Sequence, residues 1–143
     1  MDINEATEFA VSLPHRPGAL AELAGKLAAR GINIDAFMLY TSFVVTIPDV
    51  PVVAGICKLV VDREAEARRA FTEFGIPFRE GRVVVLRGRN QPGTLSKALQ
   101  PLADAGVNVG DGYASSLGDG PGDTSVVLSV SDLPKALLTM RSG

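Results

Sequence analysis

The sequence predicts an α+β fold in which one small unit occurs twice along the 143 residues. A nineteen-residue segment of the first half recurs in the second half. In both halves this segment has the apolar spacing of a helix that lies on a sheet. Short extended runs surround the helix in the same order each time, with short connections, which is the arrangement of a layered α+β domain.

The repeat itself is visible in the residues. Residues 16–34 (RPGALAELAGKLAARGINI) align without a gap on residues 91–109 (QPGTLSKALQPLADAGVNV), 75 positions further along the chain. Seven of the nineteen positions are identical, including the Pro-Gly pair and the Asn near the end. Self-similarity at a fixed spacing indicates a repeated structural unit. We therefore expect two domains, residues 1–81 and 82–143.

The first half of each copy predicts a strand and then a helix. An extended run (8–13 and 82–87) leads into Pro-Gly, because the residue before a proline is disfavoured in helical conformation. Gly31 and Gly106 are expected to follow the helix ends in the left-handed conformation. The apolar stripes of the two helices are Leu20, Leu23, Ala24, Leu27 and Ala28 in the first copy, and Leu95, Ala98, Leu99, Leu102 and Ala103 in the second.

The second half of each copy predicts a hairpin and another helix. Asp62 and Asp132 are placed to cap the second helices. Only the first copy has a clear fourth strand, so the second unit should expose an edge that a neighbour covers. The expected ranges are second strands 32–40 and 107–117, hairpin tips 48–51 and 118–123, third strands 55–61 and 124–130, second helices 64–74 and 133–140, and a fourth strand 76–80.

This order is βαββαβ, with the last strand missing from the second copy. Two such units in tandem, each an antiparallel sheet with its helices on one face, form the ferredoxin-like pattern. One residue conflicts with it locally: Pro101 falls inside the first helix of the second copy. A proline there deletes a backbone hydrogen bond and costs about 3 kcal/mol unless the helix kinks.

Composition excludes several classes of partner. The net charge is −2 and the basic residues are scattered, so neither nucleic acid nor a membrane surface is an expected partner. No signal peptide or spanning segment is evident, and we expect a cytoplasmic protein. The apolar content of 46% is high for so short a chain and predicts self-association. The single Cys57 is expected to be a buried thiol, which excludes a disulfide framework.

The Pro-Gly turn is the strongest candidate for a binding site. Pro17 suits the first helical position, but Arg16 before it cannot cap the helix, so several amides lack a partner. Together with the helix dipole, these amides favour a carboxylate at Gly18 to Leu20. Asn33 could return toward this end along the second strand and match the two charges of a zwitterion. Alternatively, Pro-Gly is an ordinary turn and Asn33 only bonds its own loop.

Pro-Gly-x-Leu before a helix, followed by Gly-Ile/Val-Asn-Ile/Val, resembles the ACT domain. The whole chain is similar to stand-alone proteins with two ACT domains, although the long hairpin 43–53 is unusual for them. The resemblance implies a ferredoxin-like fold and domains that pair edge to edge or face to face. It also implies an amino acid at the interface between the first loop of one domain and its neighbour. The implied ligand positions are Arg16, Pro17, Gly18, Ala19, Leu20 and Asn33, with Gln91, Pro92, Gly93, Thr94, Leu95 and Asn108 in the second copy.

The sequence thus favours a regulatory protein that binds an amino acid, without cofactor or metal, as a homodimer or higher homo-oligomer. The alternative is a regulatory subunit of an amino-acid biosynthetic enzyme, resembling the small subunit of acetolactate synthase. An enzyme is least favoured. His15 is the only histidine and lacks a nearby Ser or Cys partner, and common catalytic and phosphate-binding motifs are missing. Glu64, Glu66, Arg68 and Arg69 are expected to form a solvated helix face.

Overall fold

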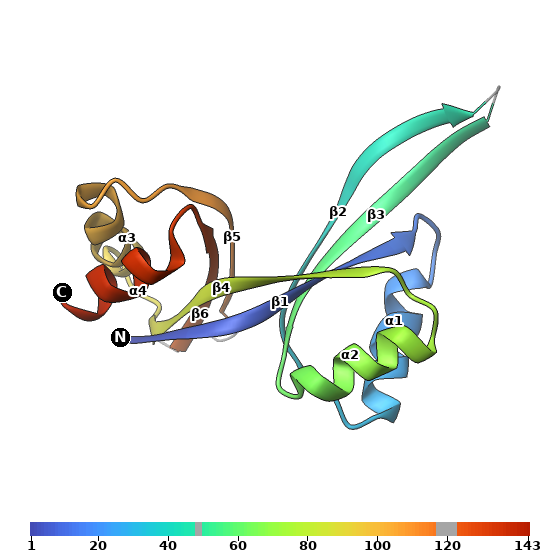
Figure 1. The fold of residues 1–143 in the computed structure, drawn as a ribbon, viewed down its shortest axis with the longest axis horizontal. Helices are drawn as coiled ribbons and strands as arrows, with labels where there is room; N and C mark the ends of the chain where they lie inside the picture. The colour runs from blue at the N-terminus through green and yellow to red at the C-terminus, as the bar shows by residue number, and fades with distance from the viewer. Residues whose placement is uncertain (48–49, 117–122) are drawn as a thin grey trace. The chain divides into compact units, whose positions relative to one another are not determined.

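The computed structural model describes residues 1–47, 50–116 and 123–143. They form two compact units, each of which mixes strands and helices (Figure 1). The first unit is Thr7–Gly81, and the second unit is Arg82–Gly143 together with Met1–Ala6. The elements in chain order are β1 (Asp2–Pro14), α1 (Ala19–Ala29), β2 (Ile34–Ile47), β3 (Val50–Val61), α2 (Glu64–Glu73), β4 (Phe78–Arg89), α3 (Thr94–Asp104), β5 (Val109–Ser116), β6 (Asp123–Val130) and α4 (Leu133–Arg141).

The first unit has the predicted ferredoxin-like architecture. Its strands are ordered β2-β3-β1-β4, and β3 pairs antiparallel with both β1 and β2. Helices α1 and α2 pack on the sheet, while the β2–β3 hairpin extends beyond them (Figure 1). Phe9 of β1 and Phe71 of α2 are fully buried and meet edge to face, with ring centroids 5.4 Å apart. Leu23 and Leu27 of α1 complete this core, so the apolar stripe holds α1 against the sheet, although Ala28 of the predicted stripe is exposed.

The second unit repeats the architecture with the strand order β4-β6-β5, β6 pairing antiparallel with β4 and β5. Helices α3 and α4 pack against the strands through a core that includes Leu86, Leu102 and Leu128. Pro101 does lie inside α3, as predicted. The stripe is narrower than expected, because Ala103 is exposed and the Leu95 side chain is 51% exposed.

The N-terminal residues supply the strand that the second copy lacks. Residues 2–6 of β1 belong to the second unit, and β1 is the hydrogen-bonded neighbour of β4. Arg141 at the end of α4 donates from both Nε and Nη2 to the Ile3 carbonyl at 3.2 Å, and Ile3 packs on the core. Arg82 Nε donates to Glu5 Oε1 at 2.8 Å. In the described residues no strand follows α4, and this segment covers the edge instead.

Several local predictions are confirmed. Gly31 and Gly106 both have φ of 69° immediately after a helix. Asp132 caps α4, its Oδ1 accepting from the Lys135 amide at 3.0 Å. Cys57 is fully buried, and burial raises the pKa of its thiol to about 11.

Other local predictions are wrong. Asp62 does not cap α2: the N-cap is Arg63, and Asp62 Oδ1 accepts from the Asn33 amide at 2.8 Å. Glu64 is not simply solvated, because its carboxylate accepts from the amide and the hydroxyl of Thr7. The expected fourth strand of the first copy and first strand of the second are one continuous strand, β4.

The predicted hairpin tips are only partly described. Pro51 belongs to β3 and Asp123 to β6, and residues 48–49 and 118–122 lie outside the described residues.

Candidate functional site

The β1–α1 turn has the same backbone in both copies. Gly18 is the N-cap of α1 with φ 86° and ψ −11°, and Gly93 is the N-cap of α3 with φ 89° and ψ −14°. Pro17 therefore lies before the helix, which corrects the expectation that it is the first helical residue. Positive φ is costly for any residue with a Cβ. The glycine is thus required by the conformation of the turn, independently of access for a ligand.

The turn leaves amides available at the start of α1. The Ala19 amide donates to the Arg16 carbonyl at 3.3 Å, and the Glu22 amide donates to the Gly18 carbonyl at 2.9 Å. No side chain caps the helix. Within the described part of the chain, the amides of Gly18, Leu20 and Ala21 have no hydrogen-bond partner. An acceptor placed at this turn would meet unsatisfied donors and the positive end of the helix dipole.

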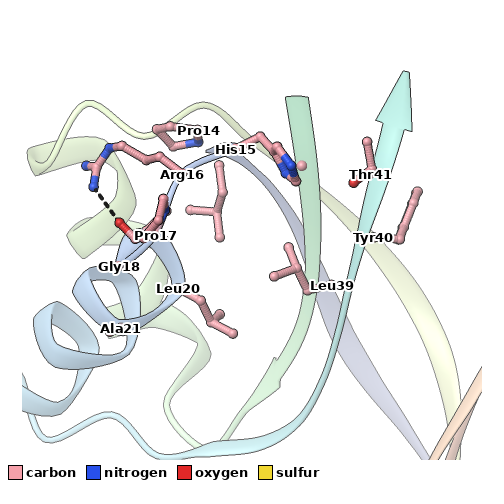
Figure 2. A pocket seen from close by; sticks show the side chains of 13 residues that line it. Pro14, His15, Arg16, Pro17, Gly18, Leu20, Ala21, Leu39, Tyr40 and Thr41 are labelled. Carbon is pink, nitrogen blue, oxygen red and sulfur yellow. Dashed lines mark hydrogen bonds between the residues drawn. The ribbon is translucent and has the colours of Figure 1, made fainter. Parts of the chain in front are cut away.

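An open cavity of about 710 Å³ lies in the first unit between this turn and β2. Figure 2 shows Leu20 of α1 and Leu39 of β2 pointing into the same space, with His15 above them. The strand side is formed by Leu39, Tyr40 and Thr41, which the sequence had not marked. The complete lining is Leu13, Pro14, His15, Arg16, Pro17, Gly18, Ala19, Leu20, Ala21, Leu39, Tyr40, Thr41 and Gly55.

Arg16, the charged side chain expected to meet the ligand, is already paired. Its Nη1 and Nη2 donate to Glu22 Oε1 at 3.1 Å and to Oε2 at 2.8 Å. Nη1 also approaches the Pro17 carbonyl at 3.4 Å, and the guanidinium points away from Leu39 (Figure 2). The hydrogen bond and the opposite charge raise the pKa of Arg16 and lower that of Glu22. Both side chains are about half exposed, so solvent screens this pair.

A second cavity of about 490 Å³ lies on the α1–β4 side of the turn, against residues 75–77. Glu22 and Lys26 of α1 line it together with Arg16. The Lys26 ammonium lies 5.2 Å from the centre of the Phe74 ring, a cation–π distance. Both partners of the Arg16–Glu22 pair are among its lining residues.

The structure does not bring the two asparagines to the cavity. Asn33 is exposed at the far end of α1, where its Nδ2 donates to Asp35 Oδ1 at 2.9 Å and its carbonyl accepts from the Asp62 amide at 3.2 Å. Asn108 is also exposed, and its amide donates to Ser131 Oγ at 2.9 Å. Strand β2 does return toward the turn, but the residues that arrive there are Leu39 to Thr41.

The equivalent cavity of the second copy is much smaller, about 110 Å³. Gln91, Thr94 and Leu95 line it, whereas Pro92 and Gly93 do not. The Met1 side chain lies over Gly88, where a Cβ would be 3.2 Å from Met1 Cε and 3.3 Å from Cγ. The N-terminal segment thus supplies an apolar side chain at a glycine, and the cavity beside the second turn is much smaller than the cavity beside the first.

Other kinds of site find little support. Among the described residues there is no group of three or more His, Cys, Asp and Glu side chains placed to hold a metal ion. His15 lines the large cavity, and Cys57 of β3 is buried in the core of the first unit, where burial raises the pKa of its thiol. None of the described helices combines the length and the apolar character that crossing a membrane requires.

Comparison with known proteins identifies part of the chain directly. The ACT domain model matches residues 7–72, within the first unit, so an ACT domain is present there. No curated protein matches the sequence.

Solved structures match over nearly the whole chain. Protein BT0572 from Bacteroides thetaiotaomicron is 22% identical with a TM-score of 0.81, covering 98% of this chain and 89% of its own. The ligand-free regulatory subunit of aspartate kinase from Thermus thermophilus is 18% identical with a TM-score of 0.60, covering 99% and 94%. The corresponding subunit from Thermus flavus is 20% identical with a TM-score of 0.52, covering 99% and 93%. At these identities the likeness establishes the shared fold.

Proposed function

We propose that this chain is a tandem ACT-domain regulatory protein that binds a free amino acid at the β1–α1 turn of its first unit. The observation that carries the proposal is the combination of free amides at Gly18, Leu20 and Ala21 with an open cavity directly beside them. The ACT domain at residues 7–72 supports it, because this is the segment that contains the cavity.

In this proposal the ligand's two charged groups are held by neutral partners. The carboxylate accepts from the free amides and lies at the positive end of the α1 dipole. The ammonium faces Thr41, which lies on the same face of β2 as Leu39 and lines the cavity. Asn33 has no part in the contact, since it lies at the other end of α1.

The proposed role is sensing without catalysis. His15 is the candidate acid or base at the cavity, and the hydroxyl-bearing residues in its lining are Tyr40 and Thr41 on β2. A nucleophile needs a base within hydrogen-bond reach, and no hydrogen bond joins His15 to either hydroxyl in the described part of the chain. A turnover of any bound amino acid that disappears in His15→Ala would overturn this part of the proposal.

A thermal-shift screen against the twenty L-amino acids tests the binding proposal. A ligand that binds only the folded state raises the melting temperature by mass action. At least one amino acid should raise it, and Leu39→Ala should reduce that rise. Leu138→Ala is the matched control, because Leu138 is an exposed leucine of α4 that lies outside the cavity. No shift with any amino acid would refute the proposal.

The exposed edge strand β2 also supports self-association. β2 is the last strand in the order β2-β3-β1-β4, and its exposed side chains include Phe37 (52%), Leu39 (43%) and Tyr40 (41%). A strand edge with exposed apolar residues favours pairing with a second chain. We therefore propose that two copies associate and cover the ligand. Light scattering that finds only monomers at micromolar concentration, with and without ligand, would contradict this.

A second candidate function is that of a regulatory subunit of an amino-acid biosynthetic enzyme. The near-complete mutual coverage with the Thermus thermophilus aspartate kinase regulatory subunit motivates it. Affinity purification of the tagged chain at native levels should then recover one enzyme in stoichiometric amount, released or retained according to the amino acid in the buffer. Recovery of the chain alone would favour the stand-alone sensor.

A further inference from the structure

The cavity of the first unit points to a narrower class of ligand, and this step rests on the proposed function. We infer that the amino acid has an uncharged, apolar side chain of the size of leucine, isoleucine, methionine or phenylalanine. Three features carry the inference: an apolar floor, the lack of an available counter-charge for a ligand side chain, and the different residues at the same positions of the second copy.

The floor of the cavity is set by strand register. Leu13 of β1 is paired with Gly55 of β3, and Leu39 of β2 is paired with Cys57 two residues further along. Paired residues lie on the same face of a sheet. Leu13 and Leu39 therefore share the face on which Leu20 of α1 lies, and all three line the cavity.

Glycine at position 55 keeps this floor open. A Cβ there would lie 3.5 Å from the Leu39 Cδ1 atom and 3.5 Å from the Leu13 carbonyl oxygen. Without it, the space between the leucines is left for a ligand side chain. Because Leu39 remains 43% exposed, an apolar side chain seated against it would remove further apolar surface from water.

The charges around the cavity do not suit a charged ligand side chain. Arg16 is the charged residue among the lining groups, and Glu22 already engages its guanidinium through two hydrogen bonds. No Asp, Glu or Lys lines the cavity in the described part of the chain, and the remaining polar lining is His15, Tyr40 and Thr41. A lysine, arginine, aspartate or glutamate side chain placed on the leucines would lose water without gaining a partner.

The second copy provides the internal contrast. Leu39 corresponds to Ala114, 75 residues further along, and the third-strand start at Gly55 corresponds to Thr124. Ala114 and Thr124 both line the small second cavity. Both copies thus keep the turn, whereas a leucine on the second strand (Leu39) and a glycine on the third strand (Gly55) are found together in the first copy.

Calorimetric titration of the full chain with L-leucine, L-phenylalanine, L-lysine and L-aspartate tests the inference. L-leucine or L-phenylalanine should bind, and the two charged amino acids should bind at least tenfold more weakly. Leu39→Ala should weaken binding of L-leucine about tenfold, since it removes partly exposed methyl groups that the ligand would cover. Leu138→Ala, which truncates an exposed leucine of α4 outside the cavity, should leave the affinity within about twofold.

The outcomes separate this inference from the proposed function. Tighter binding of L-lysine or L-aspartate than of both apolar amino acids would overturn the inference and leave amino-acid sensing intact. Equal effects of Leu39→Ala and Leu138→Ala on L-leucine binding would also overturn it, because Leu39 would then not contact the ligand. No binding of any of the twenty amino acids would refute the proposed function and the inference together.

Discussion

Replacing Gly18 with alanine tests the conformation on which the binding turn depends. At φ 86° an alanine pays a left-handed backbone penalty of about 1–2 kcal/mol. A Cβ at this position meets nothing within 4 Å, so no steric clash adds to the penalty. Alanine also restricts the unfolded chain more than glycine does, which stabilises the folded state by about 0.4–1 kcal/mol. The net expectation is that Gly18→Ala lowers the free energy of unfolding by about 1 kcal/mol.

Gly25 provides the matched control for this substitution. It lies inside α1, where a Cβ also meets nothing within 4 Å and where the second copy has Gln100. Gly25→Ala should stabilise the protein by about 0.5–1 kcal/mol, because glycine is a poor helix former. Urea unfolding followed by circular dichroism should therefore shift in opposite directions for the two variants. Midpoints that move in the same direction would refute the assignment of a left-handed N-cap at Gly18.

Three further predictions concern other parts of the molecule. Asp132→Ala should destabilise the second unit by about 1 kcal/mol in urea unfolding, because the cap of α4 is lost, whereas Asp132→Asn should be nearly neutral. The pKa of the Cys57 thiol is about 11 in the folded protein, against an ordinary value of 9.0, so between these pH values the unfolded chain loses the proton first. The free energy of unfolding should therefore fall by up to about 3 kcal/mol as the pH rises from 9 to 11. The Cys57→Ala variant, measured at each pH, should not show this fall. Calorimetry should give one ligand per chain, because Met1 reduces the second cavity; two equivalent sites would contradict that reasoning.

The repeat explains why so much of the fold was predictable. Helix position follows from the apolar stripe around Leu23 and Leu27, and the turns follow from glycines whose conformation is local. Such features depend on residues close in sequence. The N-terminal segment was missed because Asp2 and Glu5 interrupt any apolar alternation. Its place beside β4 depends on partners such as Arg82 and Arg141, which lie far away in the chain.

The candidate site was only half predictable for a similar reason. The Pro-Gly turn and its free amides are local, and the sequence indicated them. The opposite wall, Leu39 to Thr41, is defined by the register of β2 against β3, which includes an irregularity between Thr41 and Phe43. The recurrence of Asn33 with the Pro-Gly pair predicts a place for this residue at the turn. In the structure the main-chain amide of the asparagine in each copy instead donates to the loop before the second helix, and any residue other than proline could make this bond.

The most direct test of the account is the location of a bound amino acid. A ¹⁵N-resolved NMR titration of the chain with the amino acid selected by the thermal-shift screen would show it. The account predicts the largest shift changes at the amides of Gly18, Leu20 and Ala21, with further changes at Leu39 to Thr41. Changes centred on Asn33 and Asp35, or on Gly93 and Leu95 of the second unit, would contradict it.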